Sequence, residues 1–134
     1  MKLRIISVLL LLAPLGCRAT EFPIALVEYV DDSRVVALVK QSDIDQGTGW
    51  VPGSESPPLS SEDAVAIVRE ATARDSRLAA ATLNEVVLKR IPHHTDHWHY
   101  VIKLQSGPSD HPHLDFFVVL MNGRLIPAIR EPRR

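Results

Sequence analysis

The chain has 134 residues, 46% of them hydrophobic and 23% charged, with 15 basic and 16 acidic side chains and a formal net charge of −1 at pH 7. This length suits one domain with a single modest core. The net charge is not positive, which argues against a nucleic-acid-binding protein, because such proteins show a basic stripe.

The first nineteen residues have the pattern of a secretory signal peptide. Lys2 and Arg4 make a basic start, and the nearly apolar run 5–13 is too short to span a bilayer, which needs about 20 residues. Small residues follow, with Cys17 and Ala19 suited to a cleavage site. We predict cleavage after Ala19 and export to the periplasm or the extracellular space.

Two alternatives concern this leader. It is retained as an anchor, or Cys17 is acylated as in a bacterial lipoprotein, because Leu15-Gly16-Cys17 resembles the end of a lipobox. We predict membrane contact only in these two cases. Cleavage after Ala19 makes residues 1–19 the signal peptide and residues 20–134 a single domain. That domain has a net charge of −4, no cysteine and therefore no disulfide.

The mature chain begins with a predicted hairpin and an irregular connection. Residues 21–40 hold two apolar, β-branched runs around the turn residues 31–33, which indicates a β-hairpin. Residues 41–58 are rich in glycine and proline, and we expect an irregular connection there. Trp50 is its one large apolar residue, and we expect it to pin the connection to the domain.

The clearest helical pattern covers residues 59–74. Ser60 is suited to cap this helix, with Asp63 three residues further on. Apolar residues recur at helical spacing, and the pattern continues toward Ala81 although Asp75 interrupts it.

Four strands are predicted after the helix, at residues 83–91, 97–105, 113–121 and 124–129. Asn122-Gly123 predicts a type I′ hairpin turn, which needs a positive φ at both positions. Pro127 predicts that the last strand lies at an edge of the sheet, because proline cannot donate to a ladder. The element order therefore predicts an α+β fold: an antiparallel β-meander with one helix packed on one face, preceded by the N-terminal β-hairpin.

Histidines gather just before and within the second of these strands. His93, His94, His97 and His99 are potential metal ligands, with Asp96 among them. His97 and His99 have strand spacing, so a His-x-His pair with a loop histidine or Asp96 could hold zinc, copper or nickel. The alternatives are a solvated face without a role and a pH-responsive surface.

A second, thinner group contains His111, His113 and Asp115. A turn near residues 107–108 would put His97 about 16 Å from His113, so any metal site would use one group alone. No glycine-framed serine elbow and no phosphate-binding glycine loop occurs in the sequence. We therefore predict no enzymatic activity and no resident cofactor.

The second half resembles the PepSY family of small secreted or membrane-facing bacterial domains. The resemblance covers residues 57–127 and rests on three pieces, which are Pro57-Pro58-Leu59-Ser60 with Glu62-Asp63-Ala64, the strand Trp98-His99-Tyr100-Val101-Ile102, and the closing hairpin from Phe116 to Ile126. It implies a helix followed by antiparallel strands, and a non-catalytic domain that inhibits or binds. It assigns no functional residues.

The leading hypothesis is a small exported, non-catalytic domain that binds a protein or peptide in the bacterial cell envelope, since a meander offers edges for strand addition. The rival is a periplasmic metal-binding protein that uses His93, His94, His97 and His99. A hydrolase is a third class, and it requires a pocket in which Asp and His side chains have perturbed pKa values.

Overall fold

The computed structural model describes residues 22–30 and 32–132. The predicted signal peptide, with Cys17, lies outside these residues. The elements are, in chain order, β1 (Ile24–Val30), β2 (Ser33–Val39), α1 (Gln41–Asp45), α2 (Ser61–Thr72), α3 (Ser76–Ala79), β3 (Thr82–Arg90), β4 (Trp98–Ser106), β5 (His113–Leu120) and β6 (Leu125–Glu131).

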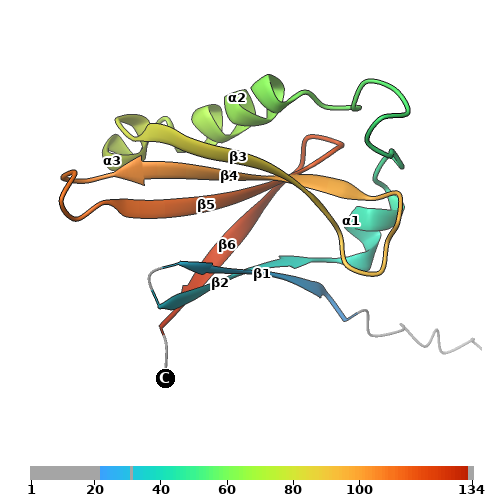
Figure 1. Cartoon of the computed structure of the whole chain (residues 1–134), viewed down its shortest axis with the longest axis horizontal. Coiled ribbons are helices and arrows are strands. Elements are labelled where there is room, and N and C mark those ends of the chain that lie inside the picture. Colours follow the sequence, from blue (N-terminus) through green and yellow to red (C-terminus); the bar gives the residue numbers. More distant parts are fainter. Residues whose placement is uncertain (1–21, 31, 133–134) are drawn as a thin grey trace, which may run out of the picture.

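All six strands belong to one antiparallel sheet with the order β1-β2-β6-β5-β4-β3 (Figure 1). The predicted fold class, a meander with one packed helix, was therefore wrong. The N-terminal hairpin does not stand apart, because β2 pairs with β6 from Arg34↔Glu131 to Ala37↔Ala128. The first hairpin thus extends the sheet beyond the last strand, and three helices are present among the described residues.

The sheet is curled into a half-barrel, so that its two outermost strands approach each other. Glu28 on β1 forms an ion pair with Lys89 on β3, although these strands stand at opposite ends of the sheet order. In Figure 1, β6 leaves β5 and runs down to β2, which places the β1–β2 hairpin below the β3–β4–β5 layer.

Two apolar clusters fill the two faces of the β3–β4–β5 layer. The inner cluster lies between this layer and the β1–β2–β6 part, and it includes Val35, Val101 and Val118. The outer cluster joins β4 and β5 to α2 through Tyr100, Ile102, Leu104, Val119, Ala64 and Val68. Both faces of β4 are buried, because Val101 belongs to the inner cluster and its neighbours Tyr100 and Ile102 belong to the outer one.

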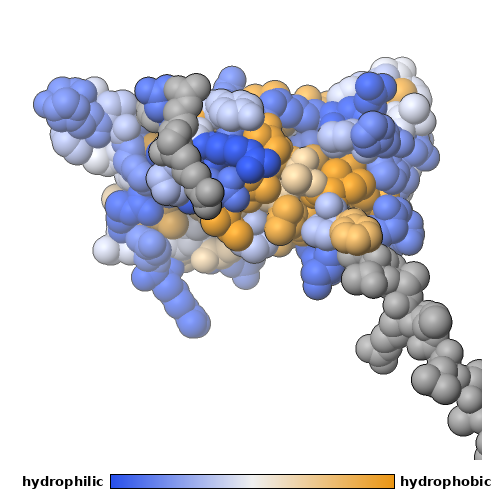
Figure 2. Space-filling view, turned by 90° about the horizontal axis from the view of Figure 1, so that it is seen from below, coloured by the Kyte–Doolittle hydropathy of each residue, from blue (hydrophilic) through white to orange (hydrophobic). Residues whose placement is uncertain are grey.

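The outer face of the β1–β2–β6 part has no covering layer among the described residues. Leu38 and Ile129 are 47% and 60% exposed on it. Figure 2 shows the molecule from below, with apolar side chains gathered across the middle of the view.

The one predicted helix corresponds to α2, which begins after Ser60 as expected and ends at Thr72. Ser60 accepts a hydrogen bond from the Asp63 amide, as expected of the cap of α2. The predicted continuation to Ala81 was wrong, because Asp75 accepts from the amides of Arg77 and Leu78 and so begins a separate helix, α3. The connection 41–58 is not wholly irregular either, since α1 lies within it.

Trp50 is buried against α2 and the sheet and donates to the Glu55 carbonyl at 3.0 Å. It pins the connection to the domain, as the sequence predicted.

Two details of the last hairpin correct the sequence prediction. Gly123 has φ of +84°, but Asn122 is not among the residues with positive φ, so the turn is not type I′. β6 is also an interior strand, although Pro127 predicted an edge. The proline is tolerated because the ladder to β5 ends at Phe117↔Pro127 and the ladder to β2 begins at Ala128.

Candidate functional site

The most unusual feature of the sheet is the short ladder between β5 and β6, which separate before either strand ends. The two strands share three residue pairs, from Val119↔Leu125 to Phe117↔Pro127. We call the pair Phe117↔Pro127, at which the two strands separate, the vertex. Beyond the vertex, residues 113–116 pair only with β4, and residues 128–131 pair only with β2. Two strand edges therefore face each other without a ladder partner among the described residues.

A cleft of about 260 Å³ occupies this split. Its walls come from the two strands, with contributions from β2 and α3. The lining residues are mainly apolar, and they are Val35, Leu78, Leu114, Asp115, Phe116, Phe117, Leu125, Pro127, Ala128 and Arg130. An apolar, concave space bordered by free backbone edges is suited to a ligand that has both apolar groups and hydrogen-bonding groups.

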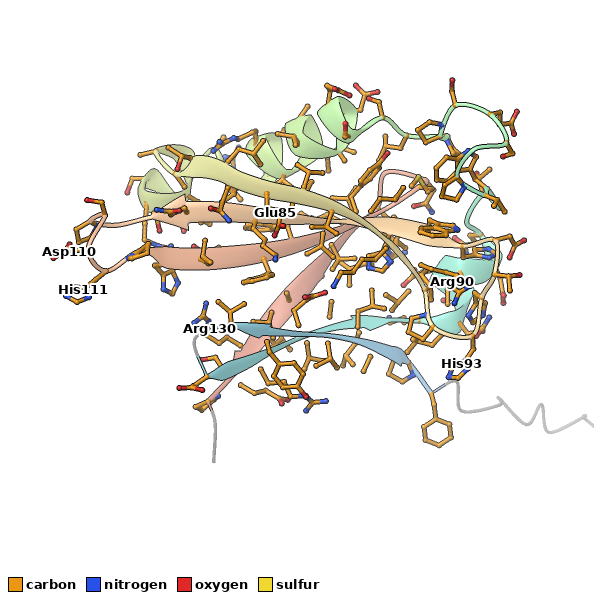
Figure 3. The ribbon with its side chains drawn as sticks, viewed as in Figure 1. Glu85, Arg90, His93, Asp110, His111 and Arg130 are labelled. Atoms are coloured by element: carbon orange, nitrogen blue, oxygen red, sulfur yellow. The ribbon has the colours of Figure 1, made fainter. Side chains whose placement is uncertain are left out.

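Two charged side chains stand in the cleft, and they differ in their partners. Asp115 is engaged by Arg77 of α3 at 2.5 and 3.3 Å, a bidentate pair that neutralises its charge. Arg130 donates to the Leu114 carbonyl at 2.6 Å and has no carboxylate within ion-pair distance among the described residues. Figure 3 shows Arg130 between the lower part of the sheet and β5. The cleft therefore carries an uncompensated positive charge.

The outermost strands offer less room for a partner. The Glu28–Lys89 pair ties β1 to β3 and stands across both outer edges. A second groove, lined by Ser61, Glu62, Val65, Leu83 and Val86, runs between α2 and β3. It has only one strand edge, and that edge is irregular because the register shifts between Leu83 and Glu85.

The predicted metal ligands are spread over two environments. His93 is exposed, and His94 contacts the Pro92 carbonyl at 2.9 Å. His97 lies before β4 and contacts Asp96 at 2.9 Å, and this hydrogen bond lowers the pKa of Asp96 below its ordinary value. The rings of His94 and His97 are 5.7 Å apart, edge to face.

His99 is separated from this loop cluster, because it points into the inner core and is 2% exposed. His99 therefore does not lie on a solvated face, which was one of the alternatives for these histidines. No three His, Cys, Asp or Glu side chains come together in a metal-binding arrangement within residues 22–30 and 32–132. The metal-binding alternative stays a prediction.

His99 is nevertheless chemically unusual. Its Nδ1 is buried and has no hydrogen-bond partner in the part of the chain that the structure describes. Burial is the main cause that lowers the pKa of His99 to about 4, and the charge of Lys89 adds to this effect while Glu28 opposes it. The side chain is neutral at pH 7.

The second histidine group lies at and beyond the outer end of the cleft. His113 Nε2 is 3.5 Å from Asp115, whereas His111 lies in the exposed turn with Asp110 at 3.8 Å (Figure 3). Ser106 accepts a hydrogen bond from Arg77 at 2.8 Å, so it is not paired with a histidine base. The contacts of Arg77 with Ser106 and Asp115 hold α3 on the sheet.

Sequence reasoning missed the cleft and Arg130, which lies just beyond the predicted last strand at residues 124–129. Pro127 was the available signal, because a proline inside a strand marks a place where a ladder is interrupted. The pairing of β6 with β2, which creates the second wall, leaves no local mark in the sequence.

No protein-family model matches this chain, and neither the curated proteins nor the solved structures include a significant match. The resemblance of residues 57–127 to the PepSY family stays a prediction. None of the helices in the described part of the chain has the length and apolar content required to cross a bilayer.

Proposed function

We propose that this protein is a non-catalytic binding domain that takes up an extended peptide segment in the cleft between β5 and β6. The observation that carries the proposal is the pair of facing strand edges, 113–116 and 128–131, that lack ladder partners in the described chain. Backbone N–H and C=O groups on such edges pair readily with an added strand.

The lining of the cleft supports a peptide with apolar side chains. Side chains of an extended peptide alternate between its two faces. Phe116 and Val35 belong to the inner core, whereas Phe117 and Leu125 belong to the outer core. Apolar contacts are thus available on both sides of a peptide that lies in the split.

The proposal is tested with a pool of hexapeptides that are acetylated at the N-terminus. In each peptide, serine alternates with valine, leucine, isoleucine or phenylalanine. Affinity selection with mass spectrometry would measure which peptides the protein retains. Ala128→Trp would fill the cleft, and Ala128→Leu would fill part of it. We expect retention to fall by more than about tenfold for Trp and less for Leu, since loss should follow side-chain volume.

Ala25→Trp is the matched control, because Ala25 is exposed on β1 and does not line the cleft. It should retain the peptides as the unaltered protein does. Equal retention by Ala128→Trp and Ala25→Trp, both verified as folded by circular dichroism, would refute binding in the cleft.

The place of action remains the cell envelope in this proposal, supported by the signal-peptide pattern of residues 1–19. Mass spectrometry of the native protein should find an N-terminus at Thr20. An intact Met1 on material from the cytosol would overturn the export proposal without bearing on the cleft.

A further inference from the structure

We propose that the cleft selects the free C-terminal carboxylate of its peptide and that Arg130 binds this group. The inference rests on the proposed function and specifies its ligand. Within the chain that the structure describes, Arg130 is the charged residue of the cleft whose charge is not compensated by an opposite charge.

The geometry of Arg130 leaves most of its hydrogen-bonding capacity unused. One guanidinium nitrogen, Nη2, donates to the Leu114 carbonyl at 2.6 Å, which fixes the group across the gap between β6 and β5. A guanidinium has five N–H donors in a planar fork that matches a carboxylate. The remaining donors have no protein acceptor among residues 22–30 and 32–132, so they are available to an anionic ligand.

The surrounding charges favour an anion over a cation. The carboxylate of Asp115 is already held by Arg77 in a two-bond contact, and Glu131 next to Arg130 is held by Arg34 at 2.8 Å. Both neighbouring acids are thus satisfied by other arginines. A carboxylate that enters the cleft meets an exposed guanidinium at the rim of an apolar lining, and the two parallel N–H donors of that group match the carboxylate geometry.

The position of Arg130 favours a chain end over a side-chain carboxylate. Continuing the register of Phe117↔Pro127 would place Leu114 opposite Arg130, so the arginine side chain closes the gap where the next main-chain pairs would have stood. Between the pair Phe117↔Pro127 and this bridge the gap extends over only residues 115–116 and 128–129, so it takes up the terminal residues of a peptide rather than the middle of a long strand. A chain that ends there gives its carboxylate to Arg130 and leaves the bridge to Leu114 intact.

The test compares two forms of the same hexapeptide pool, one with free C-terminal carboxylates and one with C-terminal amides. Retention by the unaltered protein should favour the acid form by about tenfold or more. Arg130→Gln should bring this preference close to one, and Arg130→Lys should keep part of it because the charge remains. Arg90→Gln removes the same charge at the far end of β3 and should leave the preference unchanged.

The outcomes separate the inference from the proposal beneath it. Equal retention of acids and amides by the unaltered protein would overturn carboxylate selection while peptide binding in the cleft stands. Retention of neither form would overturn both. Amide retention that is the same in Arg130→Gln and in the unaltered protein, with the acid preference lost, would support the inference and show that the variant is folded.

Discussion

At the scale of single residues, His99 shows how strongly the environment sets the chemistry of a side chain. The sequence places it among potential metal ligands, yet the curled sheet buries it. Its neighbours in the sheet are Lys89 on β3 and Leu120 on β5. A histidine in this position gains nothing from protonation, because the charged form would lose its solvation and meet the charge of Lys89. At pH 7 it is therefore a neutral, buried side chain near Glu28.

This burial predicts an acid-sensitive stability. The pKa of His99 is lowered from an ordinary value near 6.5 to about 4, so the unfolded state takes up a proton first as the pH falls. The stabilisation is present above pH 6.5 and is lost between pH 6.5 and pH 4, with a loss of about 3 kcal/mol from this group. Urea unfolding across this pH range measures it.

His99→Leu should flatten this part of the pH profile, whereas His111→Gln, a change in the exposed turn, should leave it as it is. A profile of His99→Leu that retains the full slope would show that the acid sensitivity comes from elsewhere.

At the scale of elements, the caps of α2 and α3 illustrate how local signals fix a helix start. Ser60 and Asp75 each accept hydrogen bonds from first-turn amides, which would otherwise lack partners. The early end of α2 before Asp75 follows from the same chemistry, since a residue that caps one helix has extended backbone and interrupts the preceding one.

Ser60→Ala should lower the free energy of unfolding by about 1 kcal/mol, because the Asp63 amide loses its acceptor. Ser61→Ala is the control, since the Ser61 hydroxyl donates to the exposed Glu62 side chain and caps no amide in the described part of the chain. Chemical denaturation of both variants gives the comparison. Equal effects of the two substitutions would contradict the assignment of Ser60 as the cap.

The sequence predicted the elements better than their arrangement. Alternation and turn residues located the first hairpin and the four later strands, because these signals are local. The pairing of β2 with β6 joins residues nearly a hundred positions apart, and the sequence near Val36 or Ile129 contains no local signal that predicts it. The candidate site could therefore not be predicted from local patterns, since one wall of the cleft exists only because β6 turns away from β5 to reach β2.

At the scale of the whole molecule, the curl of the sheet explains why the outermost strands and the split behave differently. The ion pair between Glu28 and Lys89 joins the two ends of the half-barrel, which lie near each other. At the split, by contrast, residues 128–131 of β6 have a ladder partner on the β2 side and none on the β5 side among the described residues. The sheet thus offers a gap bordered by two strands, whereas its outer edges offer one strand each.

Breaking the edge contact should have a small effect on stability. The Lys89 side chain is 42% exposed, and ion pairs with that much solvent contribute at most about 1 kcal/mol. A double-mutant cycle of Glu28→Gln and Lys89→Met, read by urea unfolding, should give a coupling of that size. A much larger coupling would mean that the pair is essential to the curl.

The measurement that tests the central claim most directly is amide hydrogen exchange, by NMR, of the protein with and without the tightest-binding peptide of the pool. If an extended peptide lies between β5 and β6, amides within residues 113–116 and 128–131 that face the gap should exchange fast in the free protein and become protected in the complex. Protection along the outer edge of β3, at residues 82–90, with no change at the gap would contradict the account.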